Sequence, residues 1–148
     1  MIALDEILFN ALRDDDGIVQ IVGSPTNIVS TCFEVGPEDK DNTPLPCIIV
    51  TDEGIDNDPE TKDSTWEGFE DHVTAGIEVD GRSPKEVKNL IIRCRKAVAN
   101  YVDKLERQGE VIPLLNSVKT SQLSWDWMKP CYHQVLLYNC TMTNVAYE

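Results

Sequence analysis

The residues best suited to chemistry in this 148-residue chain are a cysteine and a histidine near its end. Cys131 and His133 are two positions apart, so on a strand both side chains would lie on one face, where an imidazole could activate a thiolate. Nothing in the sequence supplies an oxyanion hole for this pair. The chain also lacks a phosphate loop, a nucleophile elbow, an H-E-x-x-H helix and a dinucleotide-binding motif. We therefore predict no catalytic residues, no enzymatic activity and no cofactor.

An acidic segment suggests a second kind of chemistry, the binding of a cation. Five oxygen-bearing side chains have the spacing of positions 1, 3, 5, 9 and 12 of a twelve-residue calcium loop: Asp56, Asp58, Glu60, Ser64 and Glu67. The sixth position needs glycine for its sharp turn but is Thr61, and Pro59 and the absence of flanking helices also oppose the geometry. We predict a solvated acidic loop at about 53–70 and no metal site, with weak divalent binding by clustered carboxylates as the alternative.

The negative charge of the chain is concentrated in one region. The formal net charge is −13, and residues 34–71 hold thirteen acids against two bases, Lys40 and Lys62. Such a surface would repel phosphate backbones, because nucleic-acid binding relies on Lys and Arg displacing counterions. We therefore predict no direct, sequence-specific binding of nucleic acid.

Composition indicates a globular protein with buried free thiols. The hydrophobic fraction is 41% and the charged fraction 26%, as in ordinary globular domains. No apolar run is long enough to span a membrane, and Asp5 and Glu6 stand where a signal peptide would be basic and then apolar, so we expect no membrane partner and a cytoplasmic location after synthesis. The five cysteines form no C-x-x-C pair, which favours buried thiols over zinc or disulfides.

Hydrophobic periodicity predicts one α+β domain spanning residues 1–148. Apolar residues at helical spacing predict an N-terminal helix that stops before the acids at 14–16, followed by a short helical turn at 18–22. A long helix is predicted at about 84–107, with Ser83 as its cap, Pro84 in its first turn and an apolar stripe facing a sheet. Strands are expected at about 28–34, 47–51, 71–81, 123–127 and 132–145. The fold predicted is a mostly antiparallel sheet of about four to five strands, packed by these two helices.

Three segments carry a resemblance to a known family. They are the opening helix at 2–13, the proline-led strand at 44–50 and the passage at 76–86 from a strand into the long helix. Together they make the chain resemble the tail terminator and tail-completion proteins of long-tailed bacteriophages. The resemblance implies a structural virion protein of the neck. It would form a homo-oligomeric ring, typically a hexamer, that caps the tail tube and performs head-tail joining through the head connector, with DNA passing through its centre.

A ring needs two unlike surfaces that meet head to tail, and the sequence offers a basic and an acidic one. We hypothesise that bases on the outer face of the long helix approach acids of the next subunit, with an apolar contact among them: Lys85, Lys88, Ile92, Arg93 and Lys96. A second hypothesis places acids of the loop toward the lumen, where they would repel passing DNA: Asp56, Asp58, Glu60, Asp63 and Glu67. The alternative is an outer loop that only keeps the protein soluble.

Two other classes of function stay open. An acidic protein could imitate the charge of DNA and block a DNA-binding enzyme, which predicts a monomer or dimer that competes with DNA. A small-molecule-binding α+β domain would instead need a concave apolar pocket with convergent polar groups.

Overall fold

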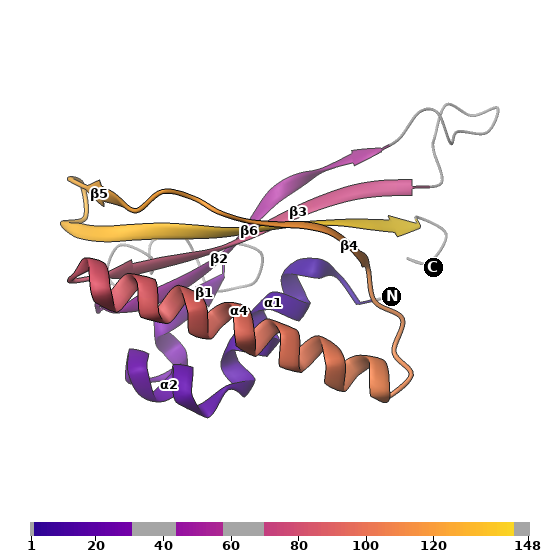
Figure 1. Cartoon of the computed structure of the whole chain (residues 1–148), viewed down its shortest axis with the longest axis horizontal. Helices are drawn as coiled ribbons and strands as arrows, with labels where there is room; N and C mark the ends of the chain where they lie inside the picture. The colour runs from indigo at the N-terminus through magenta and orange to yellow at the C-terminus, as the bar shows by residue number, and fades with distance from the viewer. Residues whose placement is uncertain (1, 31–43, 58–69, 144–148) are drawn as a thin grey trace.

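The protein is a twisted sheet with helices packed on one face (Figure 1). The structure is a computed structural model and describes residues 2–30, 44–57 and 70–143. The elements in chain order are α1 (Leu4–Asp14), α2 (Asp16–Val22), the 3-10 turn η1 (Pro25–Asn27), β1 (Ile28–Ser30), β2 (Cys47–Asn57), β3 (Glu70–Gly81), α4 (Pro84–Arg107), β4 (Leu114–Thr120), β5 (Ser124–Asp126) and β6 (Cys131–Thr143). Within these residues, no helix combines the length and the hydropathy needed to cross a bilayer.

The strand order is β1-β2-β3-β6-β4, and β5 pairs with the beginning of β6. All pairings are antiparallel except the one between β1 and β2, which is parallel. The predicted α+β class with a mostly antiparallel sheet is therefore confirmed, but the described part of the sheet has six strands rather than four or five.

The long helix has the predicted bounds because its start is fixed locally. The Ser83 hydroxyl accepts a hydrogen bond from the Glu86 N–H at 3.2 Å, and the Glu86 carboxylate accepts one from the Arg82 N–H at 2.9 Å. Pro84 stands in the first turn, where a missing N–H costs nothing. These contacts satisfy donors that a helix start leaves without intrahelical partners, so α4 begins where the sequence predicts.

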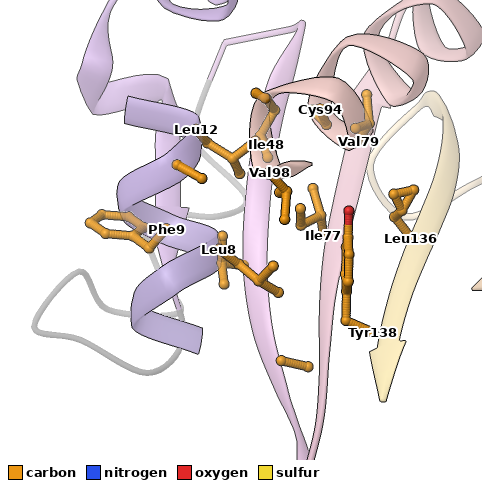
Figure 2. Close-up of a cluster of buried hydrophobic side chains, with 14 of the residues drawn as sticks. Leu8, Phe9, Leu12, Ile48, Ile77, Val79, Cys94, Val98, Leu136 and Tyr138 are labelled. Carbon is orange, nitrogen blue, oxygen red and sulfur yellow. The ribbon is translucent and has the colours of Figure 1, made fainter. Parts of the chain in front are cut away.

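The core lies between the helices and one face of the sheet (Figure 2). Figure 2 shows side chains of α1 and α4 directed at strand side chains: Leu8 and Leu12, Cys94 and Val98, and Ile48, Ile77, Val79 and Leu136. Alternate residues of β2 point the other way, where Cys47 and Ile49 form a small second cluster with Val29. Full burial of a leucine side chain contributes about 1.5–3 kcal/mol, so this layer holds the helices in place.

The predicted loop at 53–70 is wrong at its beginning. Strand β2 continues to Asn57, with Ile55 opposite Val73 and Asp56 opposite His72 on β3. A register shift between Asp52 and Gly54 allows this, and Gly54 takes a φ of 115°, which favours glycine. Figure 1 shows the paired ends of β2 and β3 projecting away from the helices. Residues 58–69 lie outside the described residues.

The sequence predicts two strands in the C-terminal region, but the structure has a third, β4, which comes before them in the chain. It forms an edge of the described sheet against β6, with a register shift between Leu115 and Ser117. The predicted hairpin beside it is confirmed, because β5 and β6 flank a turn at residues 127–130. Of the expected strand at 28–34 the structure describes only β1, and the rest lies outside the described residues.

Candidate subunit interface

The outer face of α4 presents the predicted basic residues to solvent. Lys85, Lys88, Ile92 and Lys96 follow one another at helical spacing and are all exposed. The Ile92 side chain is 45% exposed, so an apolar group stands among three ammonium groups. We call these four residues the basic face. It could receive acidic side chains around one apolar contact.

Arg93, the fifth predicted interface residue, has an acid partner in its own chain. Its Nη2 lies 3.0 Å and its Nε 3.3 Å from Oδ1 of Asp15, which joins α4 to the junction between α1 and α2. The same carboxylate oxygen accepts a hydrogen bond from the Ile18 N–H at 2.9 Å and so caps α2. Arg93 therefore has a structural contact that sequence spacing did not reveal.

Replacing Asp15 with alanine is expected to lower the free energy of unfolding by about 1–2 kcal/mol, because both the α2 cap and the Arg93 contact are lost. Replacing Asp15 with asparagine should cost less than about 1 kcal/mol, since asparagine also caps helices well. Urea denaturation of the two variants checks this order. Equal losses would show that the cap contributes little.

Of the predicted acidic residues, only Asp56 lies within the described part of the chain. It is exposed near the end of β2. The other four, Asp58, Glu60, Asp63 and Glu67, lie outside the described residues. Figure 1 shows that α4 begins at the opposite end of the sheet from the ends of β2 and β3 that carry Asp56. Asp56 and the first bases of the basic face are therefore well separated within one subunit.

An apolar pocket of about 340 Å³ opens between the helices and the sheet edge. Its walls come from α1, the second half of α4 and strands β4 and β6, and include Leu4, Ile7, Val102, Leu115, Val118 and Tyr138. Charged side chains of Arg95, Asp103 and Glu106 also line it, and all three are exposed. The sequence does not predict this pocket, because β4, which forms one wall, lacks the alternating burial of a half-buried strand.

The turn between β5 and β6 carries the most exposed large apolar side chains of the described chain. Trp127 is 84% and Met128 95% exposed. The Asp126 carboxylate accepts hydrogen bonds from the Met128 N–H at 2.9 Å and the Lys129 N–H at 3.4 Å, which fixes the turn. The rings of Trp125 and Trp127 pack in a T-shaped arrangement, with their centroids 5.8 Å apart. We call residues 127–130 the hairpin tip.

A buried ion pair holds the hairpin tip to the sheet. The Lys129 ammonium lies 3.6 Å from the Asp80 carboxylate and donates to the Cys47 sulfur at 3.4 Å. Burial lowers the pKa of Lys129, but the interactions with Cys47 and Asp80 outweigh it, and the pKa is raised overall. Lys129 therefore stays charged at neutral pH.

Ligand atoms of Glu78, Asp80 and His133 all lie within 4.8 Å of one another, an arrangement the sequence did not predict. Asp80 and His133 come together because they face each other across β3 and β6. The Lys129 ammonium already supplies a positive charge to Asp80, which disfavours a second cation at this position.

The cysteines that the structure describes are free and buried, as predicted. Burial raises the pKa of Cys131 to about 12 and those of Cys47 and Cys140 to about 11, and it raises the pKa of Cys94 still further. A thiolate is the reactive form of cysteine, so burial disfavours the reactive form of these four at neutral pH. The same effect opposes activation of Cys131 by His133. Cys32 lies outside the described residues.

No protein-family model and no curated protein sequence matches the chain. The fold matches a solved structure of the gp17 protein of bacteriophage SPP1. The TM-score is 0.52, the sequence identity is 18%, and the match covers 96% of this chain and 90% of the SPP1 protein. At this identity the match shows a shared fold. The chain thus has the architecture of a bacteriophage protein.

The match to the SPP1 protein leaves out little of either chain. Since it covers nearly all of this chain, the shared fold extends well beyond the segments at 2–13, 44–50 and 76–86 that carry the sequence resemblance. The match therefore includes much of the C-terminal region, which contains none of these three segments.

Proposed function

We propose that the chain is a structural protein of a bacteriophage neck, similar to tail terminators, and that it forms a ring with copies of itself. The ring, of about six subunits, would cap the tail tube and join it to the head connector. Its partners would be itself, the tail tube protein and the connector protein. The observation that carries the proposal is the fold shared with the SPP1 protein over 96% of this chain. The resemblance of three sequence segments to tail terminators supports the same conclusion.

The distribution of charge supports assembly of identical subunits. A closed ring joins two unlike surfaces of each subunit. The basic face begins at one end of the sheet and the acidic ends of β2 and β3 lie at the other (Figure 1). Opposite charges on well-separated surfaces favour contact between neighbouring subunits. Added salt screens these charges and would weaken that contact.

Replacing Ile92 with aspartate is expected to abolish or strongly weaken self-association, because it places a carboxylate where the proposed interface buries an apolar group. Light scattering at two protein concentrations and two salt concentrations measures this. Gln122→Asp adds the same charge to an exposed position outside α4 and should leave the mass unchanged. An unaffected oligomer in the Ile92→Asp variant would remove the basic face from the interface.

The capping role needs a test in the virus. Interrupting the gene in the phage genome that carries it should yield heads and tails that do not join, visible by electron microscopy. Supplying the wild-type protein from a plasmid should restore joined particles. Normal, infectious particles without the protein would contradict the proposed function.

A further inference from the structure

The hairpin tip is an apolar group prepared for contact. Trp127 and Met128 protrude almost fully into solvent, although tryptophan and methionine are among the residues enriched at protein interfaces. Asp126 orders the turn from one side, and the ion pair between Lys129 and Asp80 fixes it from the other. A group that is already ordered loses little entropy on binding. The tip therefore has the properties of an interface anchor.

The apolar pocket has the complementary properties. Most of its walls are aliphatic or aromatic, and Ala99, Leu115 and Val118 are exposed, so solvent reaches its mouth. The protruding part of the hairpin tip bears no free charge, because the ammonium of Lys129 is engaged by Asp80. An uncharged apolar tip can enter such a pocket without the cost of burying an unpaired charge.

The tip cannot reach the pocket of its own subunit. Tyr138 and Cys140 line the pocket, whereas the tip ends where β6 begins, at Cys131. Tyr138 lies seven positions beyond Cys131 along β6, and at about 3.3 Å per residue this is roughly 23 Å of rigid sheet. A tip could therefore enter this pocket only from another copy of the chain.

We infer that the hairpin tip of one subunit inserts Trp127 and Met128 into the apolar pocket of the next subunit. Because tip and pocket lie at different places on each subunit, this contact is head to tail. In a closed ring every subunit would insert its tip into one neighbour and receive the tip of the other neighbour in its own pocket. The inference deepens the proposed function and rests on it, since it names the surfaces by which the copies meet.

The contact would supply the anchor of the interface rather than its full area. A buried tryptophan covers about 150–250 Å², whereas a stable interface buries about 800 Å² on each partner. The remaining area has to come from other surfaces, such as the basic face. A central tryptophan in a pocket, surrounded by weaker polar contacts, is the usual arrangement of binding energy in interfaces.

Two variants that each lack one half of the contact test the inference. Trp127→Ser removes the anchor, and Ala99→Glu places a carboxylate at the mouth of the pocket. Each variant alone should associate at least about 30-fold more weakly than the wild type. An equimolar mixture should form dimers only, because one intact tip meets one intact pocket. Trp127→Phe keeps an apolar anchor and should retain most of the association.

Disulfide trapping detects the contact even if the free protein is a monomer in solution. In a Cys140→Ala background, which removes the native thiol that lines the pocket, Met128→Cys mixed with Ala99→Cys should give a cross-linked dimer under mild oxidation, well above the amount from Met128→Cys mixed with Val111→Cys. Val111 is also exposed but does not line the pocket.

Equal trapping in the two mixtures would overturn the inference. A wild-type oligomer that both Trp127→Ser and Ala99→Glu leave intact would also overturn it. That second result would leave the proposed ring standing, so the two proposals can fail separately.

Discussion

Replacing Asp80 with alanine is expected to lower the free energy of unfolding by about 3–5 kcal/mol. Asp80 is 2% exposed, and its carboxylate lies 3.6 Å from the Lys129 ammonium, whose side chain is 14% exposed. Removing the carboxylate leaves a largely buried ammonium beside the Cys47 thiol, which is neutral at pH 7. Urea denaturation at neutral pH measures the loss.

A double variant separates the ion pair from simple loss of packing. Asp80→Ala combined with Lys129→Met removes both charges and should recover most of the lost stability, because an apolar pair often replaces a buried ion pair at little cost. Asp103→Ala breaks an exposed pair with Arg107 and should cost less than about 0.5 kcal/mol. If the double variant were no more stable than Asp80→Ala, the unpaired ammonium would not be the cause.

The helices were predictable because their signals are local. The bounds of α4 follow from Ser83, Pro84 and Glu86, which lie within four residues of one another, and from an apolar stripe along the whole helix. The core residues of α1 follow from spacing in the same way. Such patterns need no knowledge of distant contacts.

The exposed strand segments were not predictable from apolar alternation. The residues of β4 are nearly all exposed, and a register shift at Asn116 interrupts the two-residue period. The end of β2, from Glu53 to Asn57, is exposed throughout and contains Gly54, so it has the composition of a loop. Pairing with β6 and β3 makes both segments strands. That pairing depends on tertiary structure rather than on local propensity.

The candidate interface was predictable only in part. The exposed stripe from Lys85 to Lys96 follows from helical spacing, and the structure places it on the surface. The contact of Arg93 with Asp15 spans 78 positions, so spacing could not reveal it. The tip did leave a signal, because Trp127 and Met128 beside a turn residue, Pro130, are unusual for a solvated hairpin. The pocket left none, since its walls come from four separate elements.

Raising the pH from 8 to 10 is expected to lower the free energy of unfolding by several kcal/mol. Once the pH exceeds the thiol pKa of the unfolded chain, each buried thiol contributes a loss of about 1.4 kcal/mol per pH unit. Burial disfavours the thiolate and raises the pKa of Cys47 and Cys140 from 9.0 to about 11. The unfolded chain releases these protons near the ordinary value. It then binds fewer protons than the native state, so stability falls as the pH rises, until the native thiols titrate near pH 11.

The slope of stability against pH distinguishes the thiols from general charge repulsion. The net charge of −13 also becomes more negative at high pH and acts in the same direction. Cys94→Ala removes one thiol from the centre of the core and leaves the surface charge unchanged. Between pH 9 and 10 the slope should therefore become shallower by about 1.4 kcal/mol per pH unit, which corresponds to about one proton. Urea denaturation at pH 8, 9 and 10 gives the slope for both proteins. An identical slope in the variant would show that surface repulsion, not thiol burial, governs the alkaline limit.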